Sequence, residues 1–291
     1  MIELPVIQES PAPERRPEWL KVRIPGAGQY GWLYDLVRTK SLHTVCEEAR
    51  CPNIAECWAA GTATFMILGD TCTRSCGFCS VKTGRPGTID WDEPNHVAEA
   101  IRAMKVRHAV ITSVNRDELA DGGASVFAAT VTQSRALNPN TRIEVLIPDF
   151  KGDNNSLDIL LESKPDIMGH NTETVPRLYR EVRPQGNYQW TLGVLKHSKE
   201  KGFVTKTGIM LGLGETLDEV REVMRDLRTV GTDILTLGQY LQPTKQHLPV
   251  ARFVHPDEFA LLKTDGMAMG FMHVESGPLV RSSYHAERAV E

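Results

Sequence analysis

The cysteines are the most constraining feature of this chain. All six lie between residues 46 and 79 of a 291-residue sequence. Cysteines that only fill a core would be scattered, and a disulfide scaffold needs more cysteines in a shorter chain. The six form two groups of three, with the spacings C-x4-C-x5-C and C-x3-C-x2-C. Thiolates bind soft metals such as zinc, copper(I) and iron–sulfur clusters, so this clustering predicts metal sites.

After residue 60 the sequence alternates between short β-rich runs and helical patterns. The predicted strands are residues 62–69, 108–114, 141–148, 167–171, 205–212, 234–240 and, last, 273–280. The predicted helices are residues 95–105, 124–136, 156–163, 190–201, 217–230 and 256–269. This alternation indicates an α/β protein with a parallel sheet. We predict a partial (β/α)6 TIM-type barrel with N-terminal and C-terminal extensions. A doubly wound open sheet is the alternative, because periodicity does not separate the two.

These changes of pattern divide the chain into three parts. Residues 1–60 form an N-terminal extension with the first cysteine trio, residues 61–270 the barrel, and residues 271–291 a C-terminal extension. In the first part, a proline-rich arm precedes short helices within residues 30–60. Its aromatic residues are expected to pack as core beneath the arm rather than to form a docking surface: Trp19, Tyr30 and Trp32.

Composition narrows the class of protein. The 33 Lys and Arg against 37 Asp and Glu give a net charge of −4, and general nucleic-acid binding needs a basic surface instead. No apolar run reaches the roughly 18 residues of a membrane span, and the N-terminus lacks the apolar stretch of a signal peptide. We therefore expect a cytoplasmic protein that binds neither nucleic acid nor membrane.

The second cysteine trio is Cys72, Cys76 and Cys79, in TCTRSCGFCS. It follows the first predicted strand, and in α/β barrels that end of the strands holds the chemistry. A structural zinc site needs four ligands, and no His or Cys follows within fifteen residues. Three thiolates on one loop instead fit a cubane cluster that has one iron left open.

With the aromatic Phe78, this C-x3-C-x2-C motif resembles that of the radical S-adenosylmethionine superfamily. The resemblance implies that the open iron binds the cofactor and that reduction yields a 5′-deoxyadenosyl radical. Three later segments at strand ends resemble the family's other motifs, although each alone is weak: 112–117, 121–124 and 208–215. We expect these residues to line the cofactor site: Phe78, Ser113, Asn171, Glu173, Arg183, Lys206 and Gln242.

The first trio is Cys46, Cys51 and Cys57, in TVCEEARCPNIAECW. One interpretation is a zinc staple completed by His43; the other is an auxiliary cluster with an unusual fourth ligand. The spacing resembles the lipoyl synthase family, as do the stretches VNRDELADGGA, GHNTETVPRLYREVRP, KTGIMLGLGE, GQYLQPT and RSSYHA. In that family a serine of the R-S-S-Y motif is the fourth ligand, which the resemblance assigns here to Ser283. Arg281 and Tyr284 of the same motif are candidates to gate the mouth of the barrel.

The resemblance implies a sulfurtransferase that inserts sulfur at C6 and C8 of an octanoyl group on a lysine of a lipoyl carrier protein. It implies two 4Fe–4S clusters, with S-adenosylmethionine consumed twice per lipoyl group and the auxiliary cluster as the sulfur source. The implied carriers are the glycine cleavage H protein and the lipoyl domains of 2-oxoacid dehydrogenases. The other implied partners are a flavodoxin or ferredoxin reductant and iron–sulfur assembly proteins.

Two alternatives stay open from the sequence. Another radical sulfur-inserting enzyme, such as a methylthiotransferase, usually has additional RNA-binding domains, for which this chain has little room. A zinc-stabilised binding scaffold would contain zinc in place of iron and sulfide.

Overall fold

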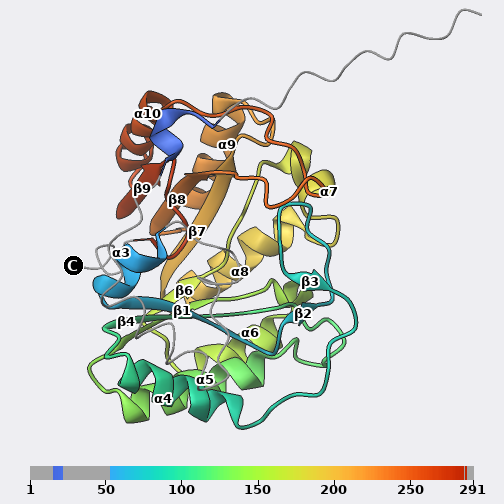
Figure 1. Ribbon diagram of the computed structural model, residues 1–291, viewed down its shortest axis with the longest axis vertical. Coiled ribbons are helices and arrows are strands. Elements are labelled where there is room, and N and C mark those ends of the chain that lie inside the picture. Colours follow the sequence, from blue (N-terminus) through green and yellow to red (C-terminus); the bar gives the residue numbers. More distant parts are fainter. Residues whose placement is uncertain (1–15, 22–52, 285, 287–291) are drawn as a thin grey trace, which may run out of the picture.

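The computed structural model describes residues 16–21, 53–284 and 286 (Figure 1). Its main sheet has seven parallel strands: β1 (Thr62–Ile67), β4 (His108–Ser113), β5 (Arg142–Leu146), β6 (Ile167–Gly169), β7 (Val204–Leu211), β8 (Ile234–Gln239) and β9 (His273–Gly277). The strands pair in chain order, from β1 at one edge to β9 at the other. A doubly wound sheet would reverse its order at a switch point, so that alternative is wrong.

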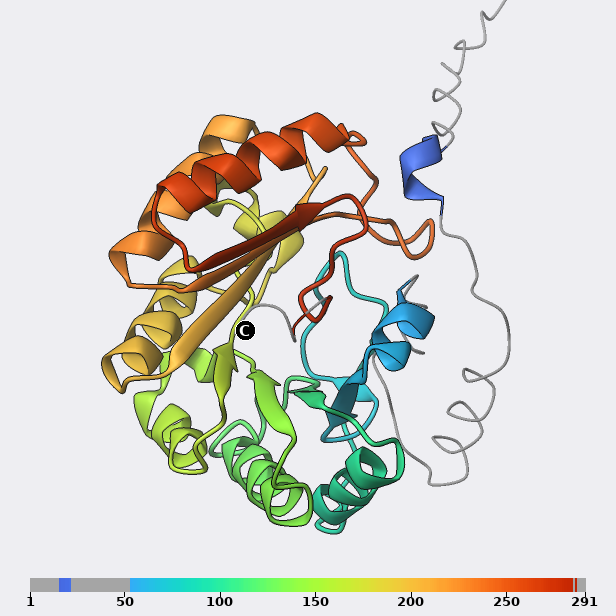
Figure 2. The same cartoon turned by 90° about the vertical axis from the view of Figure 1, so that its left-hand side faces the viewer.

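Figure 2 shows the strands as an arc with the helices around its outer side, which is the partial barrel that the sequence predicts. The covering helices are α4 (Glu93–Ala103), α5 (Ala124–Leu137), α6 (Asn154–Leu161), α8 (Tyr188–Glu200), α9 (Leu217–Thr229) and α10 (Pro256–Ala268). All predicted strands and helices after residue 60 are present, with ends that differ by three residues at most. Of the helices expected within residues 30–60, the described part contains α3 (Ile54–Ala59).

Side chains explain where several helices begin. Asp153, before α6, accepts hydrogen bonds from the N–H groups of Asn155 and Ser156. Asn187, before α8, accepts hydrogen bonds from the N–H groups of Gln189 and Trp190. Thr216 and Glu219 form a capping box at the start of α9. Each cap satisfies backbone N–H groups that the first turn of a helix leaves without partners.

The two faces of the sheet differ. Alternate side chains of each strand pack outward against the helices, in one cluster that includes Phe65 and Phe127 and a second that includes Ile209 and Phe259. The side chains between them point into the barrel, and several of these are buried polar groups: His108, Glu144, Lys206 and Thr236. The interior is therefore partly polar, although the strands read as nearly continuous apolar runs.

Short elements that the sequence did not predict lie near the carboxyl ends of the strands. They are β2 (Thr71–Cys72), β3 (Lys82–Thr83), the 3-10 helices η2 (Phe150–Gly152) and η3 (Pro176–Leu178), and α7 (Tyr179–Val182). A further 3-10 helix, η1 (Glu18–Leu20), belongs to the N-terminal part. None of the helices in the described ranges is long and apolar enough to span a membrane.

Candidate active site

The second cysteine trio lies on a loop between β2 and β3. Cys72 ends β2, and its Sγ accepts hydrogen bonds from the N–H groups of Arg74 at 3.4 Å and Asn115 at 3.3 Å. The N–H of Cys79 donates to the carbonyl of Cys76 at 3.1 Å, which closes a turn. All three thiols are half-buried. The loop therefore lies beyond the carboxyl end of β1, as predicted.

Segments from far along the chain hold the middle of this loop. The Gly77 N–H donates to the carbonyl of Val182 at 3.0 Å, and the Leu248 N–H donates to the carbonyl of Gly77 at 3.0 Å. His247 Nε2 lies 2.9 Å from the carbonyl oxygen of Cys79. A Cβ at Gly77 would come within 2.8 Å of the Leu248 side chain, so the close approach requires glycine.

Burial shapes the protonation of the thiols. It raises the pKa of Cys76 to about 11, although the Arg183 cation acts in the opposite direction. Burial also raises the pKa of Cys79 to about 12, against a hydrogen bond from the backbone of Val81. Metal ligation needs thiolates, so the loop must release protons when it binds metal.

The three thiols of this loop match the number of protein ligands of a cubane cluster that has one open iron. Among the described residues, no group of three or more His, Cys, Asp or Glu side chains converges on a point where one metal ion could lie. A closed zinc site requires such convergence of four ligands, whereas each thiolate of a cubane binds its own iron. The three neighbouring thiols on the loop therefore fit a cluster.

The predicted cofactor residues Asn171, Glu173 and Arg183 gather beyond the end of β6. The Asn171 side chain donates to Glu173 Oε1 at 3.1 Å, and Arg183 Nη1 donates to the carbonyl of Asn171 at 2.8 Å. Burial raises the pKa of Glu173, while the charge of Arg183 opposes that rise. Arg183 and Glu173 also act electrostatically on Cys76, which places them beside the cysteine loop.

Three further predicted residues border the same region. Ser113 ends β4, and its buried hydroxyl has no hydrogen-bond partner in the described structure, so it is free for a ligand. The Gln242 side chain donates to the carbonyl of His247 at 2.8 Å, and His247 in turn contacts the cysteine loop. Phe78 is partly buried against the core cluster of β7, β8 and β9.

In two of the later segments that resemble family motifs, 121–124 and 208–215, the acidic side chain accepts hydrogen bonds from backbone N–H groups of its own loop. The Asp121 carboxylate accepts N–H groups of Gly123 and Ser125 at 2.9 and 2.8 Å, where α5 begins. Gly123 has a φ of 93°, which glycine adopts readily. The Glu215 carboxylate accepts the N–H groups of Gly212 at 2.6 Å and Leu213 at 2.9 Å. Both segments thus have a structural role, and their contact with a cofactor stays a prediction.

The chain's N-terminal part and its C-terminal motif meet at a second place. The Asn53 side chain donates to the carbonyl of Leu279 at 2.7 Å, and the Tyr284 hydroxyl donates to both carboxylate oxygens of Glu56 at 3.2 Å. Tyr284 also experiences the charge of Cys57, in α3. The described member of the first trio is therefore close to the R-S-S-Y motif, whose Ser283 is half-buried in a turn. Cys46, Cys51 and His43 lie outside the described residues.

Comparison with known proteins identifies the family. Residues 66–227 match the model of the radical SAM superfamily, and residues 5–51 match that of the N-terminal domain of lipoyl synthase. A lipoyl synthase of Rubrobacter xylanophilus is 59% identical over 95% of this chain and 87% of its own length. The mitochondrial lipoyl synthase of Nematostella vectensis is 54% identical over 96% of this chain and 97% of its own. The chain belongs to the lipoyl synthase family.

Solved structures confirm the fold of this lipoyl synthase family member. Methylornithine synthase matches 81% of the chain, with 78% of its own length covered, at a TM-score of 0.55 and 15% identity. The maturase HydG of FeFe hydrogenase matches 84%, with 62% of its own length covered, at 0.56 and 15% identity. The family's cofactors are S-adenosylmethionine and two 4Fe–4S clusters, so the chain is a radical SAM enzyme that uses them.

Lys206 does not lie with the other predicted cofactor residues. It is the third residue of β7, where its Nζ donates to Glu144 Oε1 at 2.9 Å inside the barrel, and His108 Nε2 lies 3.1 Å from Glu144 Oε2. Lys206 is thus paired with Glu144 inside the barrel, and its contact with the cofactor stays a prediction. Tyr284 lines the same small interior space as Lys206, so the C-terminal motif reaches into the barrel.

Arg74 and Asp149 hold the cysteine loop and were missed from the sequence, whereas Asp117, which holds it with them, lies in the predicted segment 112–117. Arg74 lies within the C-x3-C spacing, and each aspartate follows a predicted strand. The position of Arg74 between two ligand cysteines was the available signal. The prediction that Trp19 is core is wrong, because it is 38% exposed and contacts the ring of His255 edge-on. Tyr30 and Trp32 lie outside the described residues.

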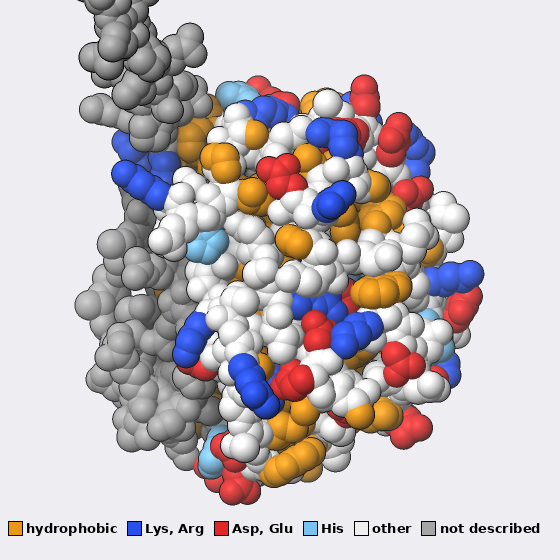
Figure 3. Space-filling view, turned by 90° about the vertical axis from the view of Figure 1, so that its right-hand side faces the viewer, with side chains coloured by type: hydrophobic (Ala, Val, Ile, Leu, Met, Phe, Trp, Pro, Cys, Tyr) orange, Lys and Arg blue, Asp and Glu red, His pale blue; other side chains and the backbone are white. Residues whose placement is uncertain are grey.

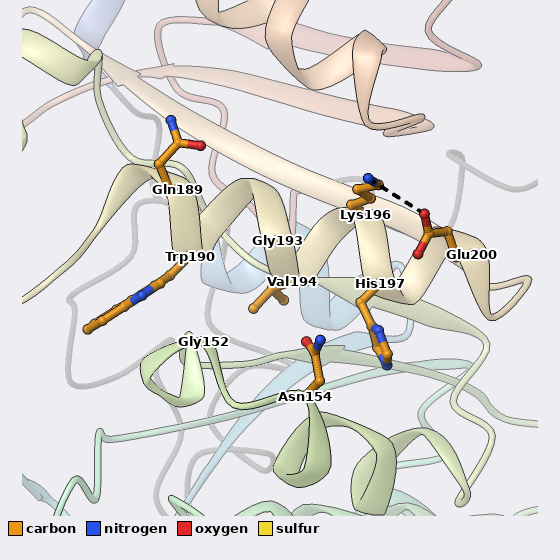
Figure 4. Close-up of a pocket in the computed structure, with 9 residues that line it drawn as sticks. All are labelled: Gly152, Asn154, Gln189, Trp190, Gly193, Val194, Lys196, His197 and Glu200. Carbon is orange, nitrogen blue, oxygen red and sulfur yellow. Dashed lines mark ion pairs between the residues drawn. The ribbon is translucent and has the colours of Figure 1, made fainter.

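A surface cavity of about 340 Å³ lies away from the thiols, between η2 and α8 (Figure 4). The Trp190 ring lies against Gly152 at one end, and the ion pair of Lys196 and Glu200 lies at the other. No residue predicted to bind a cluster or the cofactor lines this cavity.

The face of the molecule on the side of β2, β3 and α7 is drawn in Figure 3. Among the described residues on this face, basic and acidic side chains are interspersed, without a continuous basic stretch.

Proposed function

We propose that this chain inserts two sulfur atoms, at C6 and C8, into an octanoyl group attached to a lysine of a lipoyl carrier protein. The observation that supports it most is the contact between α3, which holds Cys57, and the R-S-S-Y segment, over more than 220 residues of sequence. This contact joins the two sequence elements whose resemblance to the lipoyl synthase family assigns the ligands of the auxiliary cluster.

In this proposal Cys72, Cys76 and Cys79 hold the radical-generating cluster, and Cys46, Cys51, Cys57 and Ser283 hold the auxiliary cluster. When bound, the first cluster supplies the electron that cleaves S-adenosylmethionine, and the second supplies sulfide. A serine oxygen is a hard ligand and binds iron weakly compared with a thiolate. One weak ligand suits a cluster that must be dismantled in each reaction.

The protein's own residues bind and orient the reactants. Phe78, Ser113, Asn171, Glu173, Arg183 and Gln242 border the cofactor. Within this set the free hydroxyl of Ser113 and the polar pair of Asn171 and Glu173 are available to bind its polar groups. The target carbons carry no acidic hydrogen, so a side-chain base has no role there and positioning dominates. A closed mouth excludes water and oxygen from the radical.

The partners and the compartment follow from the same chemistry. The substrates are octanoylated lipoyl carrier proteins, namely the glycine cleavage H protein and the lipoyl domains of 2-oxoacid dehydrogenases. A flavodoxin or ferredoxin reduces the radical-generating cluster, and iron–sulfur assembly proteins rebuild the auxiliary cluster. A cytoplasmic location belongs to the same proposal, and the reducing conditions of that compartment suit free thiols. The proposed division into residues 1–60, 61–270 and 271–291 separates the auxiliary cysteines from most of the barrel and from the serine ligand, although β9 of the third part belongs to the barrel sheet.

The test is anaerobic incubation of the reconstituted full chain with an octanoylated carrier peptide, dithionite and S-adenosylmethionine. We expect mass spectrometry to detect the lipoyl peptide, and metal analysis to give about eight iron and eight sulfide per chain. Cys46→Ala is expected to leave 5′-deoxyadenosine formation intact and to abolish sulfur transfer. Zinc in place of iron, or lipoyl product from Cys46→Ala, would contradict the proposal.

A further inference from the structure

Arg74 is a buried cation between two of the proposed cluster ligands. It lies in C-T-R-S-C, and 4% of the residue is exposed. An arginine is rarely buried unless it is paired, because removing its charge from water is costly. Its burial beside the thiols therefore requires partners that compensate its charge.

Two aspartates provide that compensation. Arg74 Nε and Nη2 donate to Asp117 at 2.7 and 2.8 Å, and Nη1 and Nη2 donate to Asp149, both at 2.7 Å. Each carboxylate thus accepts two hydrogen bonds from one planar guanidinium. Only arginine has the donor geometry for this double fork, because lysine presents a single point charge.

The aspartates tie the cysteine loop to two strand ends. Asp117 follows β4, and Asp149, which is fully buried, follows β5. Thr73 reinforces the first link, since its Oγ1 donates to the carbonyl of Asn115 at 3.1 Å. The middle of the loop is therefore held through protein atoms alone.

The same network reaches a third strand end. Arg183 Nη2 lies 4.0 Å from Asp149 Oδ2, while Arg183 Nη1 donates to the carbonyl of Asn171, beyond β6. The two arginines and two aspartates balance in charge. Each of the two buried arginines is thus close to a buried carboxylate of the protein.

We propose that Arg74 is a positioning residue whose paired forks to Asp117 and Asp149 fix the cysteine loop in its ligating shape before a cluster binds. The proposal rests on the assignment of Cys72, Cys76 and Cys79 as cluster ligands. Its consequence is that cluster assembly at this site needs little rearrangement of the loop.

The test is hydrogen–deuterium exchange on the metal-free full chain, comparing wild type with Asp149→Asn and Arg74→Lys. Asp149→Asn removes one charge of the network, and Arg74→Lys keeps the charge but loses the forks. We expect amide exchange in residues 72–79 to be at least about tenfold faster in both variants, with α10 unchanged. Asp265→Asn is the matched control, because it breaks an ion pair with Arg221 between outer helices.

A second measurement follows the loaded protein. We expect slower iron uptake in both variants, and an altered electron paramagnetic resonance spectrum of the reduced cluster on addition of S-adenosylmethionine. If Asp149→Asn unfolds the whole chain, Asp117→Asn replaces it, since the Asp117 side chain is 25% exposed.

Two results would overturn the proposal. One is wild-type exchange of the loop in Asp149→Asn, or in Asp117→Asn where it replaces that variant. The other is wild-type protection in Arg74→Lys, which would mean that charge alone suffices. Failure of the proposed function is a separate result: wild-type protein would then bind no cluster at this loop, while the exchange data would be unaffected.

Discussion

The two cysteine sites of this protein are held in very different ways. The loop with Cys72, Cys76 and Cys79 is tied by buried double ion pairs to the ends of β4 and β5. The site of Cys57 depends, in the described structure, on a six-residue helix that contacts the C-terminal segment through the side chains of Asn53 and Tyr284. Figure 2 shows this segment between β9 and α3, where the barrel is open.

The difference matches what each site must do in the proposed function. A cluster that cleaves cofactor repeatedly needs a fixed geometry, because small displacements are costly in such reactions. A cluster that is consumed must be rebuilt, so its site must open. Local opening is easiest where few buried contacts are broken. Hence the site of Cys72, Cys76 and Cys79, which we call the braced site, is suited to a cluster that persists. The site of Cys57, held by the contacts of Asn53 and Tyr284 that we call the clasp, is suited to a cluster that is replaced.

The largest expected effect comes from removing a ligand on either side. Cys76→Ala should abolish both 5′-deoxyadenosine and lipoyl product, because no radical forms. Cys57→Ala should abolish lipoyl product and leave 5′-deoxyadenosine formation. Chromatography of the nucleoside and mass spectrometry of the carrier peptide measure both. Equal loss of 5′-deoxyadenosine in the two variants would show that the sites do not work separately.

The frame beneath both sites is tested by Lys206→Met. Burial opposes ionisation of Glu144, but Lys206 and His108 outweigh it and lower the pKa of this carboxyl. Without Lys206 the buried Glu144 carboxylate loses its ion-pair partner and keeps only the contact with His108, so unfolding free energy should fall by about 3–5 kcal/mol. Urea unfolding of metal-free protein measures it. Lys199→Met is the control, because it breaks the ion pair of Lys199 with Asp233, in which the lysine side chain is 40% exposed. It should lower the free energy of unfolding by about 1 kcal/mol or less. Similar costs in the two variants would refute this reading of the barrel interior.

The sequence was sufficient for the fold because its signals are local. Alternating runs and helix caps such as Thr216 with Glu219 repeat along the chain, and they place each strand and helix within a few residues. Asn171 and Glu173 were expected near the cysteine loop for the same reason, since carboxyl ends of parallel strands share one edge, and the structure places them there.

What the sequence left out depends on distant pairs. Arg74 and Asp149 are 75 residues apart, and no periodicity links them. The ion pair of Lys206 with Glu144, 62 residues away, was missed because such pairing depends on strand register rather than on residue type. Ser283 entered through family resemblance, since a serine at the end of a strand carries no signal of metal ligation.

Acid should lower the free energy of unfolding through His170, a buried residue that is close enough to Asp149 for the two to interact electrostatically. Burial and the nearby Arg183 cation lower its pKa to about 4, although Asp149 opposes this. The neutral ring lies 2.8 Å from the carbonyl of Ile147 and 3.1 Å from Thr191 Oγ1. Below pH 6.5 the unfolded chain binds a proton that the folded chain refuses, so stability falls as pH falls towards 4.

From pH 8 to pH 5 this group should cost about 2 kcal/mol of unfolding free energy. Urea unfolding at both pH values measures the loss, and His170→Gln should remove that part of it. His96→Gln is the control, since the His96 side chain is 48% exposed. If His170→Gln leaves the pH dependence unchanged, the histidine is not the source of the sensitivity to acid.

The smallest effect is expected from the contact between Asn53 and Leu279, and it tests whether the two cysteine sites are held independently. Asn53→Ala removes a part-buried hydrogen bond to Leu279 and should cost about 1 kcal/mol of local stability. Because the cysteine loop has no part in that bond, 5′-deoxyadenosine should form at the wild-type rate while lipoyl yield per nucleoside falls. Asn155→Ala, at an exposed helix start, is the control. A parallel fall in 5′-deoxyadenosine and lipoyl product would mean that the contact between Asn53 and Leu279 also sets the geometry of the loop with Cys72, Cys76 and Cys79. The two cysteine sites would then be structurally coupled.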